Sequence, residues 1–371
     1  MAGRITDAGH APLGSTRQAT LSRQHSQSNV DHQLALTMHT RKLGPFDVSV
    51  ISLGCMNISH AYGTPPPPDV GGRLLLEALD LGYTHFDSAA LYGFGANETL
   101  IGEVLMPRRR EFTFASKCGF FRNEQGQRRI DGRPEVIRGN CEESLTRLRT
   151  DVIDLYYLHR WDKRVPIEES VGTLSELVRE GKVKTIGLCE VSTPTLRRAH
   201  AVHPIAAVQS EYSLWTRNPE VAVLRACKDL GVTFVPFSPL GRGFLTGELR
   251  DPATLPPKDI RHNMPRFQPE HFARNLPLLD GLGAIAQEAG CTRGQLALAW
   301  LLAQGDHIVP IPGTTRLDHL KENAGAAAIT LSDDVPARLD ALINSRTVSG
   351  ARYNDATQKE IDTEEIDAPP A

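Results

Sequence analysis

The chain has 371 residues, of which 40% are hydrophobic, and a formal net charge of −3 at pH 7. This length and composition support a large hydrophobic core, and the weak negative charge gives no electrostatic reason to expect a nucleic acid as partner. No apolar stretch reaches the ~18 to 20 residues of a membrane-spanning helix, so we expect a soluble globular protein without a membrane partner.

The beginning of the chain differs from the rest. Residues 1–37 are rich in Ser, Gln, Thr, Arg and Ala without hydrophobic periodicity, so we expect them to be disordered and dispensable. They lack the apolar core of a secretory signal, and Asp7 and Asp31 argue against the alternative of a transit peptide. We therefore expect a cytoplasmic protein whose folded part begins at Met38.

Eight strand-like runs alternate with amphipathic segments along the rest of the chain. The runs are residues 49–54, 84–89, 112–117, 152–159, 184–190, 205–211, 233–238 and 307–313. Between them, segments such as 134–151 and 166–183 carry apolar residues at helical spacing. Eight β/α units in about 300 residues fit one parallel (β/α)8 TIM barrel better than a doubly wound sheet. We predict a barrel domain over residues 38–345 and a tail over 346–371 that contributes a substrate loop and has a mobile end.

Four polar residues stand where three of these runs end: Asp87, Tyr92 five residues later, Lys117 and His159. Barrels of this type carry their chemistry at the carboxyl ends of the strands. A Tyr titrates near ~10, so it protonates an oxyanion poorly at pH 7 unless a cation such as Lys117 lowers its pKa. Asp87 would hold Lys117 in place, and His159 would donate a hydrogen bond to the same substrate oxygen. The four residues predict a proton-donating site with Tyr92 as general acid.

Each of these residues also has a structural interpretation. Asp87 and Lys117 could form a structural salt bridge, and His159 could be a hydrogen-bonded core histidine. Tyr92 could be an ordinary loop aromatic. The occurrence of all these residues together favours catalysis. A buried charge without a partner is costly, so polar groups at the ends of three strands are improbable if each is an independent core residue. We do not expect a glycosidase, since Asp87 is paired with a Lys and not with a second acid.

The six cysteines form no metal or disulfide pattern. They are scattered at positions 55, 118, 141, 189, 227 and 291, without CxxC pairs or close His companions. We therefore expect free thiols in a reducing compartment and no metal site.

Seven motifs occur in the order in which a known enzyme family carries them. They are DSAALYG, ASKCG, CEESLTRLRTDVIDLYYLHR, VQSEYSLW, FSPLGRGFLTG, QLALAWLLAQ and IPGTTRLDHLKEN. Over about residues 39–345 the chain resembles the aldo-keto reductases, and its four polar residues stand at the places of that family's catalytic tetrad. It is most similar to long-loop members from bacteria, fungi and plants, among them general carbonyl and pyridoxal reductases.

The resemblance implies an oxidoreductase that uses NADPH/NADP+ to reduce an aldehyde or ketone reversibly, on a barrel without a Rossmann domain. The sequence agrees on the last point, because its Gly-rich strings GFGANE and GRGFLTG lack the GxGxxG spacing. A long loop after the seventh strand would strap the pyrophosphate, and residues 313–316 at a helix start would bind the ribose 2′-phosphate. The cofactor-binding residues that the resemblance implies are Cys189, Glu190, Gln209, Phe237, Ser238, Leu240, Gly241, Gly243, Gly313, Thr314, Thr315, Arg316, His319, Glu322 and Asn323.

Three sites depart from the family's usual pattern. Cys189 and Glu190 follow the fifth strand where Ser-Asn or Ser-Glu is common. Phe237 replaces the Tyr that usually stacks on the nicotinamide. His319 stands where an Arg often binds the 2′-phosphate, so we expect a weaker preference for NADPH over NADH.

The partner that the resemblance implies is a small carbonyl or alcohol substrate, with no obligate protein partner. Substrate choice should lie in residues 119–135, around Trp215 and in 347–355, with Trp161 as a further candidate wall. The alternative function is that of a cofactor-binding regulatory subunit with little turnover, as in potassium-channel β subunits.

Overall fold

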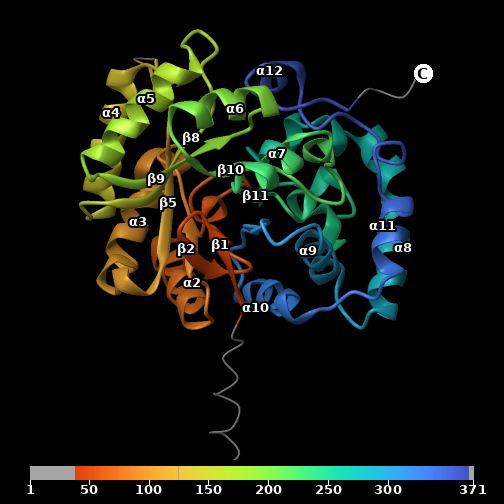
Figure 1. Cartoon of the computed structure of the whole chain (residues 1–371). Helices are drawn as coiled ribbons and strands as arrows, with labels where there is room; N and C mark the ends of the chain where they lie inside the picture. Colours follow the sequence, from red (N-terminus) through yellow and green to blue (C-terminus); the bar gives the residue numbers. More distant parts are fainter. Residues whose placement is uncertain (1–37, 124, 367–371) are drawn as a thin grey trace, which may run out of the picture. The chain divides into compact units, whose positions relative to one another are not determined.

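The computed structural model describes residues 38–123 and 125–366, so the predicted N-terminal extension and residues 367–371 lie outside it. In Figure 1 the strands lie at the centre of the described part and the helices surround them. The strands are β1 Thr40–Leu43, β2 Phe46–Ser49, β3 Leu53–Gly54, β4 His85–Asp87, β5 Thr113–Cys118, β6 Phe120–Arg122, β7 Arg128–Ile130, β8 Ile153–Leu158, β9 Val183–Cys189, β10 Ile205–Glu211 and β11 Thr233–Phe237. The helices are α2 Pro68–Asp80, α3 Ala96–Val104, α4 Pro134–Leu148, α5 Ile167–Arg179, α6 Thr193–Val202, α7 Val223–Leu230, α8 Pro269–Glu288, α9 Arg293–Ala303, α10 Leu317–Gly325, α11 Val335–Leu342 and α12 Asp355–Gln358.

Seven strands form a parallel sheet in the order β11-β10-β9-β8-β5-β4-β3, and the predicted eighth run joins its two edges. The amides of Val309 and Ile311 donate to β11, at 3.0 and 3.1 Å from their acceptors. The carbonyls of Pro310 and Pro312 accept from the amides of Ser52, just before β3, and Gly54, within it, at 3.0 and 3.2 Å. A proline has no N–H to donate, and here each proline stands where only its carbonyl is needed. The predicted parallel barrel is confirmed.

The hairpin of β1 and β2 closes the amino-terminal end of the barrel. Leu43 and Val48 are fully buried and pack with the inward-facing strand residues Ala115, Leu155, Tyr157, Cys189, Ala207, Val235, Val309 and Ile311. At Gly44 the backbone has a φ of 55°, and a Cβ would lie 2.8 Å from the Cβ of Ala206. Only glycine adopts this turn so close to the sheet.

The helices cover the outside of the sheet with the faces that their spacing predicts. In α5, Ile167, Val171, Leu174 and Leu177 are all fully buried. The helix ends at Arg179, and Gly181 follows with a φ of 75°, as expected of a C-terminal stop. Burial of this face against the sheet stabilises both elements.

The tail after residue 345 lies against the loops at the carboxyl end of the barrel. Ile361 is buried, and the amide of Asp362 donates to the carbonyl of Glu190 at 3.0 Å. The Asp362 carboxylate accepts from the hydroxyl of Ser192 at 2.9 Å. The tail therefore forms part of the walls around the strand ends up to residue 366, while its predicted mobile end falls on residues outside the described part.

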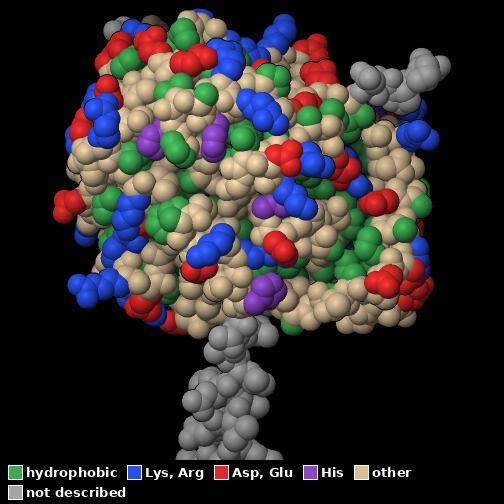
Figure 2. Space-filling view, in the orientation of Figure 1, with side chains coloured by type: hydrophobic (Ala, Val, Ile, Leu, Met, Phe, Trp, Pro, Cys, Tyr) green, Lys and Arg blue, Asp and Glu red, His purple; other side chains and the backbone are tan. Residues whose placement is uncertain are grey.

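On the face shown in Figure 2, Lys and Arg side chains are interspersed with Asp and Glu. Within residues 38–123 and 125–366, no helix is long and apolar enough to cross a membrane. The same residues contain no group of three or more His, Cys, Asp or Glu side chains placed to hold a metal ion. All six cysteines are free, as expected.

Candidate active site

A cleft of about 600 Å³ opens at the carboxyl ends of the strands. Gly54, Asp87, Cys189 and Phe237 line it, each the last residue of its strand, and so does Gln209, near the end of β10. The other predicted site residues in its wall are Tyr92, His159, Ser238, Leu240, Gly243, Gly313, Thr314, Thr315, Arg316, His319, Glu322 and Asn323. Lys117, Glu190 and Gly241 lie behind the wall. One cleft thus brings together the predicted catalytic and cofactor residues.

A buried ion pair forms the floor of the cleft. The Lys117 ammonium lies 2.5 Å from the Asp87 carboxylate and 2.6 Å from the carbonyl oxygen of Ser88. The second Asp87 oxygen accepts from the side-chain amide of Gln209 at 2.7 Å. Burial disfavours the charged ammonium, but Asp87, Tyr92 and Cys189 together more than offset this effect, so the pKa of Lys117 lies above its usual value. Lys117 is therefore a fixed cation.

Tyr92 lies directly above this cation, in a short 3₁₀ segment, Tyr92–Gly95, that follows β4. Its hydroxyl is 3.4 Å from the Lys117 ammonium, which also faces the ring at 5.1 Å from its centre. Burial raises the pKa of Tyr92 to about 12, although Lys117 opposes this rise. The sequence prediction of a lowered pKa is wrong for the protein without ligand, because desolvation exceeds the attraction of the cation. The phenol is thus fully protonated at neutral pH.

His159 faces Tyr92 across the cleft floor. The two rings meet edge to face with their centres 6.0 Å apart, and Phe120 packs on His159 at 4.9 Å. Burial lowers the pKa of His159 well below its usual value, and the cations Lys117 and Arg160 lower it further. The ring is therefore neutral, and its Nδ1 has no hydrogen-bond partner among the residues that the structure describes. A neutral imidazole can donate one hydrogen bond to a ligand in the cleft.

A second group of buried charges lies beside the tetrad and joins three parts of the chain. We call it the ion cluster: Glu190, Glu211, Arg242 and Arg352. Arg242 lies 2.6 Å from Glu211, and Arg352 contacts Glu190 directly and lies 3.6 Å from Glu211. Arg242 also donates to the hydroxyl of Tyr353 at 3.0 Å. The cluster fastens the tail and the loop after β11 to the ends of β9 and β10.

The loop after β11 crosses the cleft in tight turns. Ser238, Arg242 and Gly243 have φ values of 49°, 56° and 90°. Arg261, further along the loop, donates to the carbonyl of Arg242 at 3.1 Å. Left-handed turns and glycine bring the backbone close to the cleft, as a pyrophosphate-binding strap requires.

The far end of the cleft is the exposed amino end of α10. Arg316 contacts Asp318 and lies 3.9 Å from Glu248. The His319 imidazole lies 3.0 Å from the same Glu248 carboxylate. Thr314 accepts from the amide of Arg316 at 3.0 Å and so fixes the turn into the helix. Arg316 and His319 thus face this end of the cleft, and both lie close to the carboxylate of Glu248 in the loop after β11.

The model of the aldo/keto reductase family matches residues 50–344 of this chain. The chain belongs to the aldo/keto reductase family. It is an oxidoreductase, as its motifs predict.

The sequence is 44% identical over 324 residues to aldo-keto reductase yakc [NADP(+)] of Schizosaccharomyces pombe, which covers 86% of this chain and 95% of that protein. It is 44% identical over 315 residues to probable aldo-keto reductase 1 of Glycine max, covering 84% and 91% of the two chains. Among solved structures, glycerol dehydrogenase of Gluconobacter oxydans matches with a TM-score of 0.76 and 28% identity, over 84% of this chain and 97% of that one.

The departures from the usual aldo-keto reductase pattern have physical consequences here. Cys189 lines the cleft, and burial raises the pKa of its thiol to about 12, so it is a neutral contact. Glu190 has a φ of 56° and belongs to the ion cluster, behind the cleft wall. Phe237 keeps an aromatic face in the cleft without a hydroxyl.

Only some of the segments expected to select the substrate contribute side chains to the wall of the cleft. Phe120 and Arg128 from the first segment and Tyr353 from the tail line the cleft. Trp215 instead stacks on Phe244 at 4.0 Å inside an aromatic core, and Trp161 donates to the carbonyl of Val165 at 2.9 Å. The lining residues that the sequence did not predict include His60, Arg160, Arg242 and Arg261. For Arg242 a signal exists, since Glu211 ends a buried strand and requires a cation.

Proposed function

We propose that this aldo-keto reductase reduces aldehydes and ketones with NADPH, and that Tyr92 donates the proton to the carbonyl oxygen. The cleft suits an extended dinucleotide, because its wall carries an aromatic face at Phe237 near the tetrad and basic groups at Arg316 and His319 at the far end. The NADP(+) in the name of the fission yeast relative supports the same cofactor. Bound NADPH would supply the hydride that adds to the carbonyl carbon.

The residues of the chain supply the proton and the electrostatic support. Tyr92 is protonated at neutral pH, because its pKa is about 12, and its hydroxyl reaches the cleft. As the phenol gives up its proton, the charge that appears on its oxygen is stabilised by Lys117 at 3.4 Å. Asp87 keeps Lys117 in place, and neutral His159 donates a hydrogen bond to the reacting oxygen. In alcohol oxidation the same groups act in reverse.

The observation that carries the proposal is the contact of Tyr92 with Lys117 in the cleft wall, 3.4 Å from hydroxyl to ammonium. The test is a panel of small aldehydes and ketones assayed by the loss of NADPH absorbance. We expect turnover near or above about one per second for at least one good substrate. Rates far below this value on every compound, with NADPH still bound, would contradict the proposal and favour a regulatory subunit.

A further inference from the structure

The charges in the cleft wall are divided between its two ends. The acidic side chains that line it are Asp87, Glu248 and Glu322. Glu248 contacts His319, and Glu322 accepts from Thr292 at 2.5 Å, so both belong to the α10 end. Asp87 is neutralised by Lys117. Among the residues that the structure describes, the tetrad end of the wall therefore has no carboxylate free to oppose a cation.

Two arginines that are close to His159 line the cleft at this end, in addition to Arg242, which is paired with Glu211. Arg160 directly follows His159 and donates from its guanidinium to the His159 carbonyl at 2.7 Å. Arg128 lies over the ring of Phe120, 4.7 Å from its centre, and Phe120 in turn packs on His159. Both cations also depress the pKa of His159, after the larger effects of burial and Lys117. Both positive charges therefore act on the place where the carbonyl group reacts.

The two arginines differ in their partners. Arg128 makes hydrogen bonds of 2.6 and 2.7 Å to the two carboxylate oxygens of Glu360 in the tail. Arg160 has no carboxylate within 4.0 Å in the described part of the chain, and its one hydrogen bond uses a single guanidinium nitrogen. A guanidinium has five N–H donors in a planar fork, so most of those of Arg160 remain for a ligand.

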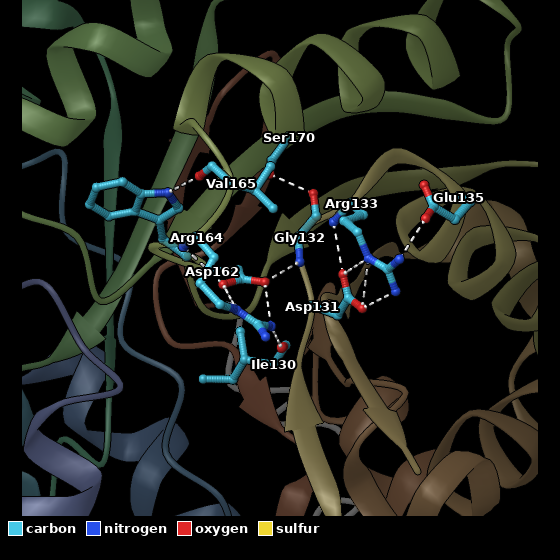
Figure 3. Close-up of polar contacts among 10 residues, drawn as sticks. Ile130, Asp131, Gly132, Arg133, Glu135, Asp162, Arg164, Val165 and Ser170 are labelled. Carbon is cyan, nitrogen blue, oxygen red and sulfur yellow. Dashed lines mark hydrogen bonds and ion pairs between the residues drawn. The ribbon is translucent and has the colours of Figure 1, made fainter. Parts of the chain in front are cut away.

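The loops that carry these arginines are fixed to each other, as Figure 3 shows. The Asp162 carboxylate accepts from the amide of Gly132 at 3.3 Å, and Arg164 donates to the carbonyl of Ile130 at 3.0 Å. The hydroxyl of Ser170 donates to the carbonyl of Gly132 at 2.7 Å. These bonds join the hairpin of Arg128 to the loop that begins at Arg160, so the two charges keep a set separation. A preorganised pair of cations loses little entropy when it binds an anion.

We propose that the substrate of this aldo-keto reductase is a carbonyl compound that carries a carboxylate, bound by Arg160, with Arg128 adding to the positive field. The planar fork of Arg160 matches a carboxylate in bidentate fashion. The proposal rests on the carbonyl-reducing function above and names the substrate class of the same site. Arg160 is a binding residue in this scheme, and Tyr92 remains the proton donor.

The test compares two aldehydes that differ by one para carboxylate, 4-carboxybenzaldehyde and benzaldehyde. For the wild-type enzyme we expect kcat/KM to be at least about tenfold higher for the carboxylated compound, the effect of one charge-assisted contact. Arg160→Gln should lower this ratio by about tenfold or more, mainly through KM. Arg129→Gln is the matched control, because Arg129 lies on the same hairpin as Arg128 but outside the cleft wall. It should leave the ratio unchanged.

Binding measured without turnover separates this inference from the proposed function. Benzoate and benzamide are titrated calorimetrically into the wild-type protein and into Arg160→Gln. Benzoate should bind more tightly than benzamide, and Arg160→Gln should remove the difference. If Arg160→Gln lowers kcat equally for both aldehydes and leaves benzoate binding intact, Arg160 only positions the His159 backbone and the proposal is overturned. If neither aldehyde is reduced but benzoate binding depends on Arg160, the proposed function fails and the anion site stands.

Discussion

The two ends of the cleft hold their charges in opposite ways. At the tetrad end, the side chains of Lys117 and Asp87 are 0% and 1% exposed. At the α10 end, Arg316 and Glu248 are 56% and 58% exposed. Strand ends position the first pair, whereas a strap and a helix start position the second. Because of this difference in exposure, we expect the buried pair to contribute to the stability of the fold and the exposed pair to affect only the affinity for the cofactor.

The physical reason is solvent. An exposed ion pair contributes about 0–1 kcal/mol, because water and salt screen it and the side chains lose entropy. Removing one member of a buried pair costs about 3–5 kcal/mol, because the remaining charge has no partner. Removing one charge of the Asp87–Lys117 pair should therefore lower rate and stability together, whereas removing a charge at the α10 end should change cofactor affinity alone.

The largest expected effect is that of Lys117→Met. It leaves Asp87 buried and unpaired, so the free energy of unfolding should fall by about 3–5 kcal/mol in urea denaturation. Carbonyl reduction should fall by roughly 100-fold or more, because the charge formed on Tyr92 loses its cation.

A double variant separates these two effects of Lys117. Adding Asp87→Asn to Lys117→Met removes the unpaired charge, so stability should recover while activity stays low. Recovery of activity along with stability would show that the pair is structural only.

The next largest effect is expected for Arg352→Met, which removes one charge from the buried ion cluster. Glu190 is fully buried and contacts Arg352, so we expect a stability loss of about 3 kcal/mol. The control is Arg274→Gln, which breaks an exposed pair with Glu270 on α8 and should cost no more than about 0.5 kcal/mol. Similar melting temperatures for the two variants would contradict the distinction between buried and exposed charges.

The smallest expected effect is that of His319→Arg at the exposed end. A guanidinium at this position adds a second bidentate group for the 2′-phosphate, so the Kd for NADPH should fall several-fold, on the order of 1 kcal/mol. The Kd for NADH should barely change, and fluorescence titration of both cofactors measures the difference. If the Kd values for NADPH and NADH fell by the same factor, the 2′-phosphate would not bind at this end of the cleft.

The sequence alone predicted the strands and the meeting of Asp87, Tyr92, Lys117 and His159, because both follow from local patterns. Eight apolar runs of regular spacing define the barrel, and Asp87, Lys117 and His159 each lie at or next to the end of a strand. Even the last run, which Pro310 and Pro312 interrupt, takes its predicted place, since the prolines need only their carbonyls.

The ion cluster and the pKa of Tyr92 did not follow from local patterns. Glu190 and Arg352 are 162 residues apart, and the second lies in a tail without hydrophobic periodicity. The pKa of Tyr92 depends on how far all neighbouring elements exclude water, and a strand-end pattern contains no such information. The partners of charges and the extent of burial are properties of the packed molecule.

The central claim is that Tyr92 delivers the proton, and single-turnover reduction by NADPH between about pH 6 and 10 tests it most directly. The wild-type rate should show no alkaline loss from Tyr92 in this range, because a group with a pKa of about 12 stays protonated there. Tyr92→Phe should be roughly 100-fold slower or more at every pH, with NADPH binding and melting temperature unchanged. Near-normal reduction of every good substrate by Tyr92→Phe would contradict the account and assign the proton to another donor, with His159 the nearest candidate.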